Sequence, residues 1–261
     1  MIVFNLFCSG AMLLLFLMFL GFVLSRALNL TSIIDSLWPL GPVFMACYLL
    51  LPIGFSWLNF YTLFILSLWA LRLSLFIFMT RLLKKHEDPR YEKILSRVEA
   101  KKKNRAIFFQ FMFQGFLQIL ISLSFLPFVW SQGEFYLSFV VIGFCFSFLA
   151  IIGEAYADFE LFKFKKKQKK GVLMTGFWAY SRHPNYFCDW CFWLGIGFLG
   201  CSLPWGLLSF IAAILMWIIF NYLTGPLTER MSLSKYPEIY SDYQKRVPFM
   251  IPSFFRGRPR L

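Results

Sequence analysis

The stretch of the chain with the most chemically capable residues is YSRHPNYFCDWC, residues 180–191, which stands directly before the apolar run FWLGIGFLG. Pro184 is typical of the first turn of a helix, so this stretch predicts a helix that begins there. The first N–H groups of a helix are unpaired, and the helix dipole is positive at that end. With Arg182 beside it and Lys169 and Lys170 nearby in the sequence, the predicted helix start favours binding of an anion such as a pyrophosphate.

Asn185 and Asp189 lie four residues apart, on one face of this predicted helix. An amide and a carboxylate in apolar surroundings lose hydration at a high cost unless they bond to a partner or a ligand. The alternative interpretation is structural. In that case Arg182 and His183 anchor the helix at the membrane surface, and Asn185 and Asp189 cap the helix or bond to a neighbouring one.

Other polar residues are expected at the same depth. Glu154 and Asp158 are spaced i, i+4 on a helical face that continues to Lys165. Glu229 follows another apolar run, within TGPLTER. Acids on one helix, an amide and an acid on another, and basic loops next to them predict a polar pocket. Ion pairing among these groups is the rival interpretation.

The six cysteines lie mostly in apolar segments, where a free cysteine behaves as a small apolar residue. CDWC has the C-x-x-C spacing of redox and zinc sites. A structural zinc site, however, needs about four ligands, and the chain has only two histidines. We predict no metal site and no disulfide framework, with a redox dithiol at CDWC as the alternative.

The elements that carry these residues must be membrane helices. Of 261 residues, 59% are hydrophobic and only 15% are charged, against about 25% charged in soluble domains. Several apolar runs reach the length of about 20 residues that crosses a bilayer. We therefore predict an all-α, polytopic membrane protein with about seven transmembrane helices, in a single membrane domain of residues 1–261. The predicted crossings are residues 4–25, 33–53, 55–83, 106–130, 134–162, 184–203 and 205–224.

Nearly all of the 26 Lys and Arg residues fall in residues 81–105, 163–182 and 230–260, which the predicted crossings place on one side. Short loops rich in Lys and Arg stay in the cytoplasm, so we expect an outside N terminus and a cytoplasmic C terminus. The net charge of +13 then reflects topology and contact with anionic lipids, and no nucleic-acid partner is expected. Basic loops that converge under a helical bundle can also hold a phosphorylated cofactor.

Several blocks of sequence resemble steroid 5-alpha-reductase-like integral membrane proteins. The C-terminal blocks are GEAYADFELFKFK, GFWAYSRHPNYFCDWCFWLGIGF, GPLTERM and YPEIYSDYQKRVPFMIP, and the N-terminal blocks are SIIDSLWPLG, LWALRLSL and HEDPRYEKI. The resemblance runs through nearly the whole chain. It is closest to a mostly bacterial branch that is related to sterol reductases and isoprenylcysteine carboxyl methyltransferases.

The resemblance implies a membrane bundle whose C-terminal helices and cytoplasmic loops hold NADPH, and a reaction that reduces a carbon–carbon double bond in a lipid-like substrate. At the matching positions, Asn185 and Asp189 would contact the nicotinamide end of the cofactor. Asp158 and Glu154 would contact the cofactor from the preceding helix. The other cofactor-binding residues that the resemblance implies are Arg182, Lys165, Arg90 and Tyr91 near the phosphates and ribose, and His183, Tyr186 and Glu229.

One position departs from the family motif. The resemblance leads us to expect N-Y-x-G followed by an acid, and Cys188 stands where the glycine would be. A cysteine at a point where a backbone or a cofactor approaches closely would narrow the pocket.

Reduction of a double bond needs a hydride from NADPH and an acid that protonates the resulting carbanion or enolate. We expect residues 106–261 to form the cofactor side and residues 1–105 the substrate side. On the substrate side the candidate catalytic residues are Asp35 and Arg72, which would polarise a substrate carbonyl. A structural ion pair between Asp35 and Arg72 is the alternative. The tyrosine and glutamate pair associated with steroid reductases has no match, so the pattern does not specify a steroid.

Two other functions share parts of this pattern. Isoprenylcysteine carboxyl methyltransferase-like membrane enzymes also carry R-H-P-x-Y at a helix start, which would imply an S-adenosylmethionine-dependent methyltransferase. A membrane protein that keeps the fold and binds a lipid or a nucleotide without chemistry is the third interpretation. We expect a multi-pass protein of a bacterial inner (plasma) membrane rather than of the endoplasmic reticulum, with a lipid-like substrate and membrane lipids as partners.

Overall fold

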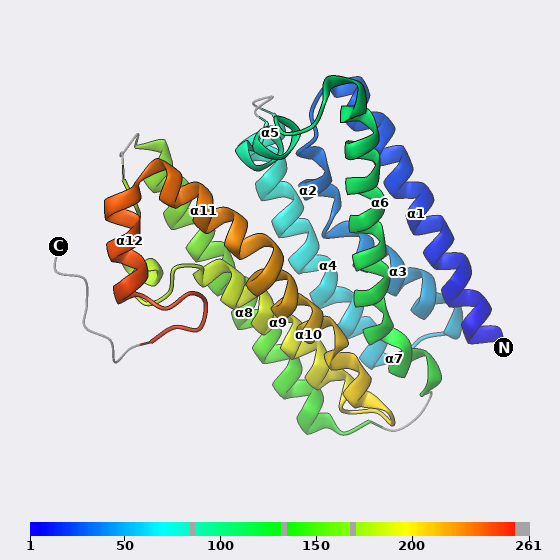
Figure 1. Cartoon of the computed structure of the whole chain (residues 1–261). Coiled ribbons are helices and arrows are strands. Elements are labelled where there is room, and N and C mark those ends of the chain that lie inside the picture. The colour runs from blue at the N-terminus through cyan, green and yellow to red at the C-terminus, as the bar shows by residue number, and fades with distance from the viewer. Residues whose placement is uncertain (84–86, 132–134, 168–170, 254–261) are drawn as a thin grey trace. The chain divides into compact units, whose positions relative to one another are not determined.

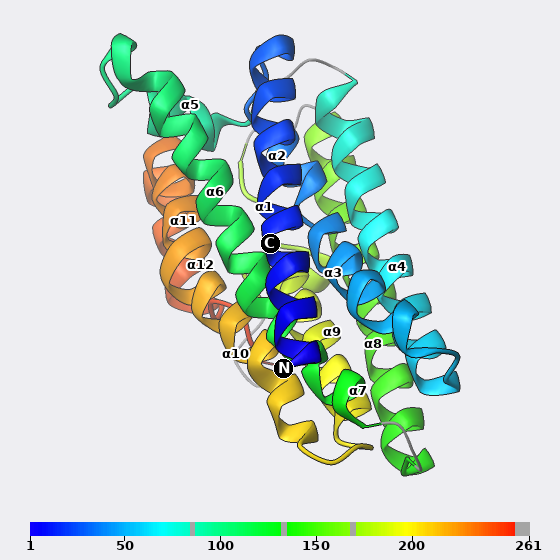
Figure 2. The ribbon, with the colours of Figure 1, turned by 90° about the vertical axis from the view of Figure 1, so that its right-hand side faces the viewer.

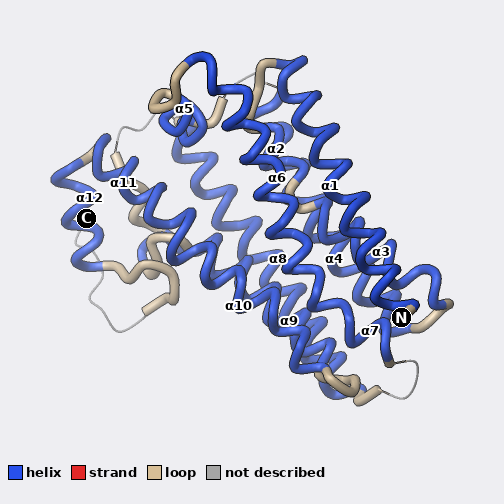
Figure 3. Tube along the Cα trace, turned by 45° about the vertical axis from the view of Figure 1, so that its right-hand side comes forward, coloured by secondary structure: helices blue, strands red, loops and turns tan. Residues whose placement is uncertain are grey.

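The computed structural model describes residues 1–83, 87–131, 135–167 and 171–253. These residues form helices joined by turns and loops, with no β-strand among them (Figure 1, Figure 3). The α-helices are α1 (Ile2–Leu28), α2 (Ile33–Leu37), α3 (Leu40–Leu50), α4 (Trp57–Ile77), α5 (Pro89–Leu95), α6 (Lys103–Ser122), α7 (Leu126–Trp130), α8 (Leu137–Lys166), α9 (Pro184–Gly200), α10 (Ile211–Ile218), α11 (Gly225–Lys235) and α12 (Pro237–Arg246). Short 3-10 or π turns are η1 (Leu51–Ile53), η2 (Phe78–Leu82), η3 (Ala100–Lys102), η4 (Leu123–Phe125), η5 (Gly176–Ala179), η6 (Gly206–Phe210) and η7 (Ile219–Thr224).

The predicted all-α, multi-pass membrane architecture is confirmed. Among the described residues, six helical stretches are long and apolar enough to cross a membrane: Ile2–Leu28, Ile33–Ile53, Trp57–Leu82, Ala100–Trp130, Leu137–Lys166 and Gly206–Lys235. The remaining predicted crossing, 184–203, is α9, whose 17 residues span only about 25 Å. This length lies at the lower limit for a hydrocarbon core of about 30 Å. The sidedness of the two termini stays a prediction, and residues 84–86, 168–170 and 254–261 of the predicted basic segments lie outside the described residues.

The second predicted crossing consists of two helices instead of one. α2 ends at Leu37 and α3 begins at Leu40, with Pro39 between them. Proline has no N–H to continue the i→i−4 hydrogen bonds of a helix, so the ladder is interrupted at this point. The break places Asp35 on a short helix of its own, near the end of the crossing.

The chain forms two compact units. Unit 1 is Met1–Phe144 with Ile196–Ala212, and unit 2 is Cys145–Gly195 with Ala213–Leu261. In unit 1, α1 runs beside α6 and α3 beside α4 (Figure 2). The single membrane domain with a substrate side and a cofactor side stays a prediction.

The interior of unit 1 is closely packed and apolar. Met45 of α3, Trp69 of α4 and Phe111 of α6 are fully buried, while large apolar side chains such as Phe16 and Phe64 are exposed. An apolar exterior of this kind is unfavourable in water and suits a lipid environment. The exposed apolar residues therefore agree with the membrane assignment.

In unit 2, hydrogen bonds join α8 to α9 and to η5. The Ser147 hydroxyl of α8 donates to the Phe192 carbonyl of α9 over 3.2 Å. The indole N–H of Trp178 in η5 donates to the Ala157 carbonyl of α8 over 3.1 Å. Such bonds need the elements to lie close together, which small residues such as Ser147 and Ala157 allow. These bonds hold the middle of α9 and the turn before it against α8.

Cys188, the departure from the family motif, faces a glycine on the neighbouring helix. A Cβ atom added to Gly153 of α8 would lie 2.9 Å from the Cys188 Sγ, closer than real Cβ atoms come to other atoms. The volume of Cys188 is therefore accommodated by the absence of a side chain at Gly153.

Gly153→Ala should lower the free energy of unfolding by about 1–3 kcal/mol, because an added methyl group overpacks a close-packed interior. Adding Cys188→Ala to this variant should recover part of the loss, since it removes the sulfur that the new methyl group meets. Thermal unfolding of the wild type, both single variants and the double variant in detergent measures this. A double variant less stable than Gly153→Ala alone would show that the two side chains do not compete for one space.

Candidate functional site

Arg182, just before α9, is bonded to protein by nearly all of its guanidinium N–H groups. Its Nε and Nη2 donate to the two carboxylate oxygens of Glu229, over 2.6 and 3.2 Å. Its Nη1 donates to the carbonyls of Gln244 and Val247, over 3.1 and 2.6 Å. The Arg182 and Glu229 side chains are only 10% and 14% exposed. Arg182 therefore clamps the start of α9 to α11 and to the end of α12.

The segment after α12 crosses the same helix start. The Arg182 N–H donates to the Pro248 carbonyl over 3.0 Å, and the Ser181 hydroxyl donates to the Met250 carbonyl over 2.7 Å. The Ser253 N–H donates to the Tyr180 carbonyl over 3.1 Å. Residues 248–253 thus lie along the turn that precedes α9 and help to shape it.

Glu229 is the acceptor at which several elements meet. Besides Arg182, the Gln244 amide donates to Glu229 over 2.8 Å, and the Tyr240 hydroxyl donates over 3.3 Å. The His183 Nε2 lies 3.4 Å from the same carboxylate. These contacts show Glu229 as an ion-pair partner inside unit 2, and its predicted contact with a cofactor stays a prediction.

His183 and Tyr186 belong to a stack of three rings. The ring centroids of His183 and Tyr186 are 4.8 Å apart at 9°, and those of Tyr186 and Phe220 are 4.6 Å apart at 7°. The stack joins the start of α9 to η7. Burial lowers the pKa of His183 below its usual value of 6.5, and the charge of Arg182 lowers it further, although Glu229 acts in the opposite direction. His183 is therefore neutral at neutral pH.

Acidification should destabilise the protein through His183. The unfolded chain binds a proton on this histidine near pH 6.5, whereas the folded protein does so only at a lower pH. The stability that is present above pH 6.5 is therefore lost as the pH falls from 6.5 towards the lower pKa of His183 in the folded protein. His183→Gln removes the titrating group, so the gap between the unfolding temperatures at about pH 7.5 and about pH 5.5 should shrink. If the variant keeps the full gap, the acid sensitivity belongs to other groups.

At the second residue of α9, an amide meets a buried carboxylate. The Asn185 Nδ2 donates to the Asp158 Oδ1 of α8 over 3.2 Å. Glu154, Asp158 and Asp189 are 3%, 8% and 7% exposed. The Asn185 Oδ1 is buried and accepts no hydrogen bond within the described part of the chain. The arrangement is rich in hydrogen-bond acceptors and suits a ligand that offers amide or hydroxyl donors.

Lys165 lies near the end of α8, beyond the acids on the same helix. It is exposed, and Lys163 and Lys166 share the last turn with it. Seven residues of helix separate Asp158 from Lys165, which corresponds to about 10 Å along the axis. The helix therefore carries acceptors first and cations about two turns later.

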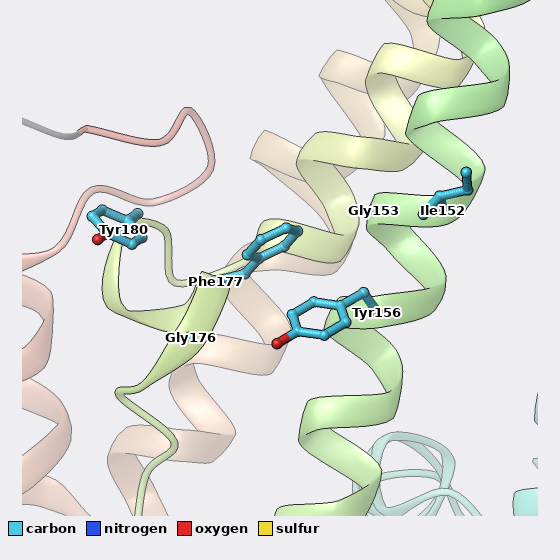
Figure 4. A pocket seen from close by; sticks show the side chains of 6 residues that line it. All are labelled: Ile152, Gly153, Tyr156, Gly176, Phe177 and Tyr180. Atoms are coloured by element: carbon cyan, nitrogen blue, oxygen red, sulfur yellow. The ribbon is translucent and has the colours of Figure 1, made fainter.

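An open pocket of about 430 Å³, which the sequence pattern did not indicate, lies between α8 and η5 (Figure 4). The rings of Tyr156 and Phe177 meet at its wall, with centroids 4.9 Å apart. The signal that could have revealed it is the i, i+4 pair Ile152 and Tyr156 on α8, opposite the aromatic turn GFWAY. The lining residues are Ile152, Gly153, Tyr156, Gly176, Phe177 and Tyr180.

In unit 1, Asp35 is held by two arginines and a tyrosine. Its carboxylate accepts from the Arg81 Nη1 over 2.8 Å, from the Arg90 Nη2 over 2.5 Å and from the Tyr91 hydroxyl over 2.5 Å. Asp88, which caps α5, shares both arginines, at 2.6 Å from Arg81 and 3.0 Å from Arg90. Arg90 and Tyr91, expected near the cofactor phosphates, thus hold Asp35, and their cofactor role stays a prediction.

Asp35 contacts Arg81 and Arg90, whereas the sequence pattern had suggested an ion pair with Arg72. Arg81 lies in the π turn η2, directly after α4. A π turn inserts an extra residue and so rotates the side chains that follow it. Arg72 lies on α4, nine residues before Arg81, which corresponds to about 14 Å along a helix. The long apolar run hides this change of register.

The charges of this network affect its titration. Burial alone would raise the pKa of Asp88, but hydrogen bonds and charge from Arg90, with the charge of Arg81, lower it to about 2. Burial and the charge of Asp35 raise the pKa of Tyr91 well above its usual value. The phenol therefore stays protonated and remains a donor to Asp35.

Comparison with curated proteins gives two partial matches. The chain is 27% identical over 164 residues to "Delta(14)-sterol reductase ERG24" of Saccharomyces cerevisiae, covering 52% of this chain and 35% of that protein. It is 33% identical over 91 residues to "Uncharacterized protein C594.04c" of Schizosaccharomyces pombe, covering 32% of this chain and 24% of that protein. The matches therefore span well under half the length of these curated relatives. No solved structure matches the chain significantly.

A family model covers most of the chain. The matched residues, 21–247, include the Asp35 network, the acids of α8, the start of α9 and the Glu229 contacts. Every cluster of polar residues described above therefore lies inside the match. This multi-pass helical membrane protein belongs to the family described as "Protein of unknown function (DUF1295)".

Proposed function

We propose that the protein is an NADPH-dependent membrane reductase that reduces a carbon–carbon double bond in a lipid-like substrate. The observation that carries this proposal is the half-buried Asn185 side chain, which donates to the buried Asp158 carboxylate and whose own Oδ1 is buried. Buried carboxylates such as Glu154 and Asp158, in a stretch that can cross a membrane, are costly and so favour a ligand-binding role. The partial similarity to a sterol reductase supports the class of reaction.

The residues of unit 2 fit the nicotinamide and ribose end of the cofactor. The carboxamide and hydroxyl groups of that end are hydrogen-bond donors, and the Asn185 Oδ1 is a buried acceptor that receives no hydrogen bond from the described residues. Asp158 holds the Asn185 amide in place, and Asp189 adds acceptor capacity one turn further into α9. Lys165 would hold the phosphates. NADPH, when bound, supplies the hydride.

Arg182, Glu229, His183 and Tyr186 support this site from the start of α9. Because the Arg182 guanidinium is already bonded to Glu229 and two carbonyls, we assign it the positioning of the helix start rather than a phosphate contact. The ring stack of His183 and Tyr186 braces the same turn against η7. These residues would set where Asn185 points.

To polarise a substrate carbonyl we propose the charged residues of unit 1, Asp35 and Arg72. Both lie in stretches apolar enough to cross a membrane, where charges are rare and tend to serve function. Tyr91 donates to Asp35 and would orient its carboxylate.

The proposed setting is a bacterial plasma membrane, with the N terminus outside and the basic ends of the helices in the cytoplasm. The concentration of Lys and Arg in three segments supports this orientation. The cofactor is then drawn from the cytoplasm and the substrate from the bilayer.

Asn185→Ala should weaken NADPH binding about tenfold, because it removes one buried hydrogen bond to the ligand. NADPH fluorescence, titrated with purified protein in detergent, measures the affinity. Asn221→Ala is the matched control, since the Asn221 amide donates to the Trp217 carbonyl of its own helix over 2.9 Å. Equal affinities of Asn185→Ala and the control would remove Asn185 from the site. Binding of S-adenosylmethionine in place of NADPH would change the reaction class to methyl transfer.

A further inference from the structure

We propose that unit 2 also binds an anionic phospholipid, with an acyl chain in the pocket between α8 and η5 and the headgroup at Lys163 and Lys167. This ligand is separate from the proposed substrate and cofactor, and its site uses none of the residues assigned to them.

The pocket is suited to a hydrocarbon chain. Ile152, Tyr156 and Phe177 line it and are 52%, 49% and 42% exposed, so large apolar surfaces remain uncovered. The rings of Tyr156 and Phe177 stand at the wall of the pocket (Figure 4). The α8 residues of the wall lie in Leu137–Lys166, a stretch that is long and apolar enough to cross a membrane, so this wall is compatible with contact to lipid chains.

The cations that select an anionic headgroup follow on the same face of α8. Lys163 and Lys167 come seven and eleven residues after Tyr156, which correspond to about two and about three full turns. The Lys167 N–H donates to the Lys163 carbonyl over 3.2 Å, so the helical register continues to Lys167. Both lysines are exposed. A lipid that lies along this face meets apolar wall first and cations about 10 Å further on.

On this face of α8 one acid, Glu160, lies between the pocket and the lysines, and it already has a partner. The Glu160 carboxylate accepts from the Phe177 N–H over 3.1 Å, next to Gly176, whose φ is +60°. This contact holds η5 in place and so shapes the pocket. The single negative charge is outweighed by the two lysines of this face, Lys163 and Lys167.

Native mass spectrometry of the full chain in detergent, titrated with dioleoyl phosphatidylglycerol or dioleoyl phosphatidylcholine, tests the headgroup site. The wild type should bind phosphatidylglycerol more tightly. Lys163→Gln with Lys167→Gln should weaken phosphatidylglycerol binding about tenfold, since each lysine near an anionic headgroup contributes to affinity, and should leave phosphatidylcholine binding unchanged.

Lys165→Gln with Lys166→Gln is the matched control, because it removes the same charge from the same helix end but on other faces. This pair should retain phosphatidylglycerol affinity within about twofold. Equal losses in the two double variants would mean that only surface charge attracts the lipid, and would overturn the site. Displacement of the lipid by inorganic phosphate alone would also overturn it, because the acyl chain would then contribute nothing.

Ile152→Trp tests the acyl chain. Ile152 is exposed, so the larger side chain fills the pocket without entering the core. Binding of both lipids should weaken about fivefold, because the apolar contact is blocked. Wild-type affinity in this variant, with an unchanged unfolding temperature, would show that lipids do not use the pocket.

Discussion

Glu229→Ala should lower the free energy of unfolding by about 3–5 kcal/mol, because it leaves the buried Arg182 guanidinium without its counter-charge. The variant also removes the acceptor of the Gln244 amide and the Tyr240 hydroxyl. The start of α9 and α12 both lose their partner on α11 in one substitution. Thermal unfolding in detergent, followed by circular dichroism, measures the loss.

Asp242→Ala is the control for this prediction. Asp242 also pairs with an arginine of unit 2, but the side chains of Arg246 and Asp242 are 44% and 49% exposed. Exposed pairs contribute at most about 1 kcal/mol, so this variant should remain close to the wild type. Similar small losses in both variants would contradict the role of Glu229 as the acceptor that joins α9, α11 and α12.

Asp35→Ala should cost about 3 kcal/mol, because two arginines and a phenol lose the acceptor that they share. The expected loss is smaller than for Glu229, since the Arg81 side chain is 35% exposed and keeps Asp88 as a partner. Thermal unfolding of the variant in detergent, compared with the wild type, measures the change.

Glu99→Ala provides the matched control in unit 1. Glu99 pairs with Lys102 at exposures of 73% and 66%, so its loss should be near zero. Asp35→Asn separates stability from chemistry, because it keeps the shape and removes the charge. A variant Asp35→Ala as stable as Glu99→Ala would show that the network does not support the fold, and would leave Asp35 free for catalysis alone.

Most of the helical architecture could be predicted from the sequence, because crossing a bilayer demands long apolar runs whatever the tertiary contacts are. Pro184 marked the start of α9 correctly, since proline is tolerated in the first turn of a helix. The break at Pro39 went unnoticed, because the residues on both sides are apolar and the run reads as one crossing.

The candidate site was predicted only in part. The contact of Asn185 with Asp158 agrees with the expected convergence of polar residues on α8 and α9. The pairing of Arg182 with Glu229 joins residues 47 positions apart. A local sequence pattern cannot predict such a distant partner. The partners of Asp35 were missed for another reason. The π turn η2 changes the direction of the Arg81 side chain, and α5 supplies Arg90 and Tyr91 from a separate segment. A regular α-helix assumed from the sequence would not place these side chains against Asp35.

The segment after α12, residues 247–253, has a practical consequence. Three carbonyls, from Val247, Pro248 and Met250, receive donors from Arg182 and Ser181. Proteolysis or a premature stop codon that removes these three carbonyls would destabilise the turn before α9, although no proposed ligand contact would be lost. A purification tag appended beyond Ser253 leaves those acceptors intact, and nonsense alleles upstream of Val247 are expected to behave as full losses of function.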